Sequence, residues 1–308
     1  MRPRDTRRHF LPAGSIGYFS FARQPPQLRK RPIYVLRKER SQPYITTPEN
    51  VGLRKHLYGY GREWDWDSYF KTGERYVHQP VDALMKAGPG QFDLQDWIRV
   101  VWYVSTLITR GPDLEFEVER KAIQMGIDPR TASPGYILNA QRAGVAVLRA
   151  RWALEWSIER DFIFPDRGVT GLFYPPWGTY AYHIPLRKNF AVLLGAGPYP
   201  KKAVPAASTW HIQLEYQMRR AAGTDVINSL AWLACHDECY GPNSSQLLQA
   251  REQAAQLPEQ SRAVAQAYGG AQLLGLSVEE RMRDELLLLS LVAGVRPRNA
   301  VGPTDLLL

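Results

Sequence analysis

The residue with the most reactive side chain near the start of the sequence is His9, which follows two arginines and precedes an apolar, aromatic run. An imidazole titrates close to neutral pH and can therefore pass protons. Guanidinium groups beside it bind phosphate through paired hydrogen bonds. The stretch Arg7–Phe21 (RRHFLPAGSIGYFSF) thus suits proton transfer, a basic arm that holds a polyanion, or an anchor that ties the N-terminus to a core. Its spacing leaves these three roles open.

A second group with reactive side chains is CHDEC, which contains Cys235, His236 and Cys239. On a helix, two thiols four residues apart share a face, as two zinc ligands would. The sequence has no second cysteine pair, and His236 would point about 100° away from Cys235. We therefore expect the cysteines to pack as small apolar groups, and we predict no metal site.

The positive charge of the chain is concentrated at its N-terminus. The 308 residues carry a formal charge of +9, and the first forty hold eleven Lys and Arg residues against Asp5 and Glu39. All of the excess charge therefore lies in residues 1–40, where local positive potential would concentrate phosphates. We expect contacts to nucleic acid from Arg4, Arg7, Arg8, Arg29, Lys30, Arg31, Arg37 and Lys38. A solvated basic surface without a specific partner is the alternative that this asymmetry leaves open.

A β-hairpin is predicted within this basic region. Two short stretches, 16–21 and 32–37, are rich in aromatic and β-branched residues, as strands are. Their connection contains Pro25 and Pro26 in succession, which disfavour both helix and strand interiors. We therefore expect residues 1–40 to form a basic N-terminal arm and hairpin whose connecting loop carries its charges outward.

Two helices are predicted before residue 161. Asp93 would cap the first, whose apolar residues recur at helical spacing as far as Arg110. The second would occupy 134–160, with Trp152 and Trp156 four residues apart on one face. We expect this long helix to form the spine of the core.

The second half of the chain changes from strands to helices. Short β-rich pieces separated by Gly and Pro turns occupy 161–195, and the lack of helices between them favours an antiparallel sheet. Further helices are then expected at 225–240 after a Thr224 cap, near 244–268, and from a capping box at Ser277 and Glu280.

Composition and length bound the architecture. Hydrophobic residues make up 44% of the chain and charged residues 22%, which is typical of a globular protein. We predict one α+β domain over 1–308, with a central, mostly antiparallel sheet packed against long helices, and a loop at 201–208 before the closing helices. The chain has two cysteines, and its most apolar run, 286–295, is about half as long as a bilayer crossing needs. The sequence therefore predicts a cytoplasmic, soluble protein.

Several short motifs follow one another in a characteristic order. They are His9–Pro12 (HFLP), Pro48–Val51 (PENV), Arg110–Pro112 (RGP), Phe162–Asp166 (FIFPD), Pro185–Leu186, and an Asn228-bearing helix ahead of Tyr240–Gly241. This order resembles the bacterial family known as domain of unknown function 4238, whose members begin with His-x-x-Pro, over most of residues 7–241. The resemblance implies a shared fold and a shared site, with no established activity to transfer.

His9, Arg110 and Asp166 are the polar residues that the resemblance singles out as a candidate catalytic site. An imidazole to move a proton, a guanidinium to grip phosphate and a carboxylate to orient the imidazole would suit a phosphodiesterase or nuclease. Such an enzyme needs the three groups to converge on one phosphate. The structural alternative is that His9 satisfies a backbone partner while Arg110 forms an ion pair with Asp166.

Three functions are consistent with these features. The leading hypothesis is nucleic-acid binding through the basic arm, mainly by phosphate contacts, with strand cleavage as an open question. The second is a non-catalytic scaffold that docks its arm on an acidic protein partner. The third is a small-molecule enzyme with a site between helices and sheet. No phosphate-binding loop, dinucleotide-binding turn, nucleophile elbow or HExxH motif occurs, which disfavours the common nucleotide-hydrolysing and hydrolase folds and leaves any cofactor unknown. The short apolar run predicts no membrane partner.

Overall fold

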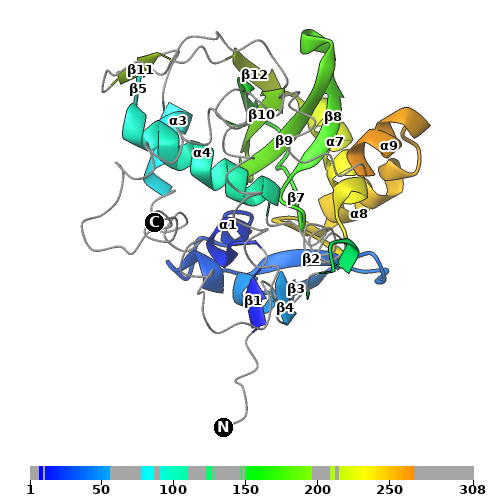
Figure 1. The fold of residues 1–308 in the computed structure, drawn as a ribbon. Coiled ribbons are helices and arrows are strands. Elements are labelled where there is room, and N and C mark those ends of the chain that lie inside the picture. The colour runs from blue at the N-terminus through cyan, green and yellow to red at the C-terminus, as the bar shows by residue number, and fades with distance from the viewer. Residues whose placement is uncertain are drawn as a thin grey trace.

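The computed structural model describes residues 7–9, 11–55, 78–86, 91–109, 123–126, 128, 147, 150–195, 209–211 and 215–266. These residues form an α+β fold, as predicted, in which mostly antiparallel sheets are flanked by helices (Figure 1). No helix in these ranges is long and apolar enough to cross a membrane. The predicted loop at 201–208 and the helix expected from Ser277 lie outside the described residues.

The larger sheet has five strands. In spatial order they are β12 (Glu215–Arg219), β6 (Arg151–Ser157), β10 (Phe190–Gly195), β9 (Thr179–Arg187) and β8 (Thr170–Tyr174). All neighbours are antiparallel except β12 and β6, which run parallel. Every residue of β10 is buried, because this strand lies in the middle of the sheet between two covered faces. The antiparallel sheet predicted for 161–195 is thereby confirmed.

Strand β6 corrects the long helix predicted for 134–160. Residues 151–157 pair with both β10 and β12 instead of forming helical turns. The spacing of Trp152 and Trp156 misled the sequence interpretation, since residues four apart share a face in a strand as well as in a helix. Residues 134–146 of the predicted helix lie outside the described part of the chain.

The smaller sheet joins segments that are far apart in the sequence. Its strands, in spatial order, are β3 (Tyr44–Thr46), β2 (Ile33–Arg37), β13 (Glu238–Gly241) and β7 (Phe164–Pro165), all antiparallel. Two further antiparallel pairs are β1 (Arg7–His9) with β4 (Leu53–Lys55), and β5 (Gln91–Asp93) with β11 (Thr209–His211). Figure 1 shows β1, β2, β3 and β4 together at the end of the molecule where the chain begins.

The predicted hairpin of 16–21 with 32–37 is wrong in its first strand. Helix α1 (Ala13–Gly17) covers the start of that segment, and Ile16 and Phe19, three residues apart, are both fully buried. The second strand exists as β2, but its partners are β3 and β13. A short 3-10 helix, η1 (Leu28–Lys30), lies so close to Gly17 that a Cβ there would collide with the carbonyl group of Leu28.

The remaining helices lie around the two sheets (Figure 1). Their bounds are α3 (His78–Lys86), α4 (Leu94–Thr109), α7 (Ala221–Ala234), α8 (Ser244–Ala254) and α9 (Glu259–Gln266), with 3-10 turns η2 (Pro48–Asn50) and η4 (Pro175–Trp177). Helix α4 confirms the prediction from Asp93. A single helix was expected near 244–268, but two form, because Pro258 interrupts the helical hydrogen bonding ahead of α9.

Candidate functional site

The backbone of His9 lies in β1, where it pairs with Leu53 of β4. The same register places Arg7 opposite Lys55 and Arg8 opposite Arg54. Four cationic residues are therefore aligned across two neighbouring strands. Arg4, Arg110 and the side chains of β1 lie outside the described part of the structure, so their predicted roles stay predictions.

Asp166 follows β7 and is almost completely buried, at 1% exposure. Its Oδ1 accepts a hydrogen bond from the backbone N–H of His236 at 2.6 Å. Its Oδ2 accepts from the N–H groups of Asp237 at 2.6 Å and Glu238 at 3.0 Å. Burial raises the pKa of this carboxyl to about 6, and the three N–H donors oppose that rise. The carboxylate therefore holds the turn between α7 and β13 in place, which is a structural task.

The segments that carry the three predicted catalytic residues meet at Gly168. This glycine has φ +76°, and a Cβ built on it would lie 3.0 Å from Leu11 Cδ2 and 3.1 Å from the Leu107 carbonyl oxygen. Leu11 comes two residues after His9, and Leu107 comes three residues before Arg110. The turn after Asp166 thus lies against the side chain of Leu11 and the backbone of Leu107.

Two of the predicted nucleic-acid contacts are engaged within the chain. Arg37 donates through Nε to Glu238 Oε2 at 2.9 Å and also lies 3.8 Å from Glu39 Oε1. Lys38 donates through Nζ to the carbonyl oxygen of Cys235. Glu238 is buried and also accepts from the Gly52 N–H at 3.1 Å. Because these partners already use the two cations, Arg37 and Lys38 contribute little to an anion-binding surface.

The segment 21–31, called the basic loop below, presents its cations differently. Arg23, Arg29 and Lys30 are exposed, and no described carboxylate forms an ion pair with any of them. Arg31 instead donates from Nε to the Pro25 carbonyl at 2.9 Å and from Nη2 to the Pro26 carbonyl at 3.2 Å. These bonds brace the loop from inside while its other cations face water.

A buried charged cluster that the sequence interpretation missed lies on one face of the larger sheet. Glu155 on β6 accepts from Arg219 Nε on β12 at 2.7 Å, and its other oxygen lies 3.4 Å from His183 Nε2 on β9. Burial raises the pKa of Glu155, while Arg219 opposes that rise. Burial also holds the pKa of His183 well below its ordinary value, and Arg219 adds to this effect. The cluster can pass a proton only if water or substrate reaches it, and both Glu155 and His183 are almost fully enclosed.

No local sequence signal marked this cluster. Glu155 falls within the helix predicted for 134–160, and His183 is a single histidine within the β-rich segment 161–195. A strand assignment for 151–157 would have placed Glu155 on the sheet face opposite that of Trp152 and Trp156.

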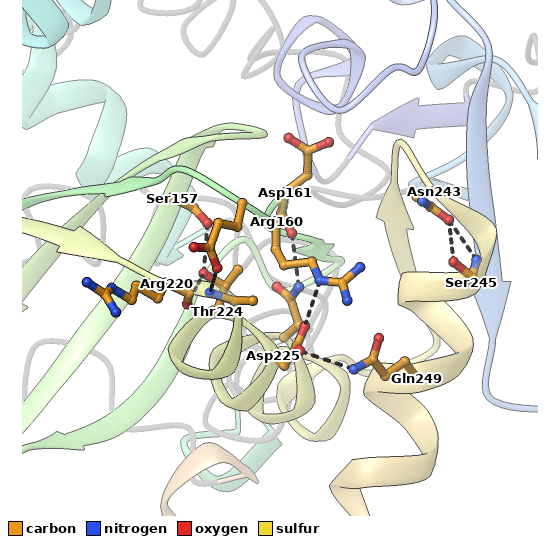
Figure 2. A network of polar contacts seen from close by, with 12 residues as sticks. Ser157, Arg160, Asp161, Arg220, Thr224, Asp225, Asn243, Ser245 and Gln249 are labelled. Carbon is orange, nitrogen blue, oxygen red and sulfur yellow. Dashed lines mark hydrogen bonds and ion pairs between the residues drawn. The ribbon is translucent and has the colours of Figure 1, made fainter.

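The start of α7 is fixed to the larger sheet by a network of polar contacts (Figure 2). Thr224 Oγ1 lies 2.7 Å from Ser157 Oγ. The prediction that Thr224 caps this helix is wrong, because α7 begins at Ala221 and Arg220 is its N-cap residue. Asn228 accepts from the Ile163 N–H and donates to the Asp161 carbonyl, each at 3.0 Å. The asparagine that contributes to the family resemblance therefore supports the backbone ahead of Asp166.

Cys235 and Cys239 do not share a helix, which corrects the interpretation of CHDEC. Cys235 caps the end of α7, and Cys239 lies on β13. Both thiols are free and buried among apolar residues, so their predicted packing is confirmed. Burial and the neighbouring Cys235 raise the pKa of Cys239 well above its ordinary value. Within the described ranges, no group of His, Cys, Asp and Glu side chains is arranged to hold a metal ion.

Comparison with known proteins found no matching family model, no matching curated protein and no matching solved structure. The resemblance to domain of unknown function 4238 therefore stays a prediction.

Proposed function

We propose that the protein binds nucleic acid through strands β1 and β4 and the basic loop. The observation that carries the proposal is the register of β1 with β4, which aligns Arg7 with Lys55 and Arg8 with Arg54. Like charges directly opposite each other destabilise a strand pair. The two pairs alternate between the faces of the ribbon. A polyanion that lies on either face would relieve the repulsion within the pair on that face, and it would release its own counterions on binding.

The basic loop supports the same proposal because it belongs to the same part of the molecule. The 3-10 turn η2, which leads into β4, packs against both α1 and η1. Arg29 and Lys30 lie on η1, and their side chains are exposed. In this proposal the basic loop and the two strands contribute to one cationic surface. Such a surface suits phosphate contacts, which carry little sequence information, better than base readout by a recognition helix.

The direct test measures binding of the full-length chain to a fluorescein-labelled oligonucleotide by anisotropy at several KCl concentrations. We expect the logarithm of the affinity to fall linearly with the logarithm of the salt concentration. The double substitution Arg29→Glu and Lys30→Glu should weaken binding and reduce the magnitude of the salt slope by about two.

The matched control for this test reverses two exposed charges outside the proposed surface, at Lys86 and Arg220. This variant has the same net charge as the first and should bind as the wild type does. Equal losses in the two variants would mean that net charge alone drives association. No binding at low salt would overturn the proposal in favour of an acidic protein partner.

Cleavage of the bound strand is a second candidate function, favoured by the meeting of three segments at Gly168. In this scheme His9 would move the proton, and Asp166 would position the backbone. The substitution His9→Ala should abolish cleavage of a labelled oligonucleotide and leave the melting temperature unchanged. Undiminished cleavage in the variant, or a melted variant, would count against a catalytic role for His9.

A further inference from the structure

An exposed aromatic ring stands at the base of the basic loop. Phe21 is 43% exposed, and its ring centroid lies 4.8 Å from that of Tyr34, with 36° between the planes. Tyr34 belongs to β2, the second strand of the smaller sheet, and packs against the core cluster around Leu36. The Phe21 ring is therefore supported by a fixed neighbour, while nearly half of its side chain is open to solvent.

The position of Phe21 relative to the cations is fixed by hydrogen bonds at the base of the loop. Ser20 Oγ donates to the Pro32 carbonyl at 2.6 Å, which joins the two ends of the segment. The same oxygen accepts from the Ala22 N–H at 3.0 Å and so holds the chain on the far side of Phe21. The hydrogen bonds from Arg31 to the carbonyl groups of Pro25 and Pro26 hold the loop from within. The Phe21 ring and the exposed cations therefore belong to one loop whose two ends are joined.

A ligand that satisfies both features must carry planar, apolar rings and negative charges along one chain. Unpaired nucleotides have this chemistry, because each base has a free face and each linkage a phosphate. In a duplex the bases are stacked on one another and offer no such face. We propose that the basic loop binds single-stranded nucleic acid, with one base stacked on Phe21 and the adjoining phosphates held by Arg23, Arg29 and Lys30.

The neighbouring strand extends the surface on which a base would lie. Ile45 on β3 is the cross-strand partner of Tyr34 and is 57% exposed. Paired residues of neighbouring strands lie on the same face of a sheet. Phe21, Tyr34 and Ile45 thus form an apolar strip at the base of the basic loop. This inference rests on the proposed function, to which it adds the class of nucleic acid and a stacking residue.

The experiment compares a 20-nucleotide thymidine homopolymer with a mixed-sequence 20-base-pair duplex, using the full-length chain and anisotropy. The wild type should bind the single strand more tightly than the duplex. Phe21→Ala should lower single-strand affinity by about tenfold, since stacking of one base is worth that much. Its salt slope should not change, because no phosphate contact is lost. Phe21→Trp should keep the affinity, since a larger ring stacks at least as well.

The matched control is Phe173→Ala on β8. Phe173 is 53% exposed and has an aromatic neighbour in Tyr180, 5.7 Å away between ring centroids, so it matches Phe21 in being an exposed ring with one aromatic neighbour. The Phe173→Ala substitution should leave the affinity for the single strand unchanged. Ultraviolet cross-linking of a uridine homopolymer, followed by mass spectrometry, should place the modified peptide at Phe21.

The outcomes separate this inference from the function on which it rests. Binding that weakens in the Arg29→Glu, Lys30→Glu variant but not in Phe21→Ala would overturn the stacking site and leave nucleic-acid binding intact. Equal or tighter binding of the duplex by the wild type would do the same. No binding of either probe at low salt would overturn both proposals.

Discussion

At the scale of single residues, Asp166 shows how a buried carboxylate can organise backbone instead of performing chemistry. Three consecutive N–H groups, from His236 to Glu238, point at its two oxygens. Bonds of this kind to a charged acceptor are stronger than those between neutral groups. Burial nevertheless outweighs them, because it raises the pKa of the carboxyl from 3.8 to about 6. The ionised form is therefore less favourable in the folded protein than in the unfolded chain.

This pKa predicts a specific pH dependence of stability. The folded protein binds the Asp166 proton more tightly than the unfolded chain does, so the contribution of this group is complete below pH 3.8 and is lost as the pH rises through about 6. Lowering the pH from 7 to 5 should raise the free energy of unfolding by about 1 kcal/mol through this group alone. The measurement is urea unfolding of the wild type and of Asp166→Asn at both pH values.

The prediction concerns the difference between these two proteins, because other titrating groups contribute equally to both. Asp237→Asn is the matched control, since the Asp237 side chain is 76% exposed and should behave as the wild type does. An identical pH dependence in the wild type and in Asp166→Asn would contradict the assigned role of this carboxyl.

At the scale of elements, a buried ion pair joins the parallel strands β12 and β6. Arg219 on β12 reaches Glu155 on β6, and the Arg219 side chain is 15% exposed while that of Glu155 is fully buried. Removing one member of a buried pair leaves the other charge without compensation. This pair therefore adds to the backbone pairing of the edge strand, and we expect loss of either member to destabilise the sheet.

Replacement of Arg219 by methionine should therefore destabilise the protein by about 3 kcal/mol, as judged by urea unfolding. Adding Glu155→Gln to this variant should recover part of the loss, because the unpaired charge is then absent. A double variant that is no more stable than Arg219→Met would show that packing, and not charge, accounts for the effect.

The elements also show where sequence patterns succeed. The helix after Asp93 and the strands of 161–195 were predictable because their apolar spacing and their turns agree on one structure. The structures of residues 13–17 and 151–157 were not predictable, since their short apolar patterns fit helix and strand alike. Contacts with distant parts of the chain decided between the two. Long-range pairing also explains why Cys239 lies in a strand, since β13 pairs with β2 and β7.

At the scale of the whole molecule, the N-terminal charge was predictable from composition, but its availability was not. Counting residues could not reveal that Glu238, far along the chain, neutralises Arg37. Nor could it reveal the alignment of β1 with β4 or the support of Phe21 by Tyr34. The Glu155 cluster escaped prediction because its members come from three strands that meet only in the folded sheet. Sites made of distant residues leave no local signature in a single sequence.

The order of strands in the smaller sheet has a consequence for biosynthesis. Strands β2 and β3 leave the ribosome early, yet the central neighbour of β2 is β13, which ends at Gly241. Pairings between such distant segments form slowly, because a long stretch of chain must first be closed into a loop. One edge of β2 therefore has no partner strand during most of translation. A nascent chain stalled before residue 238 should recruit chaperones more readily than one stalled after residue 266.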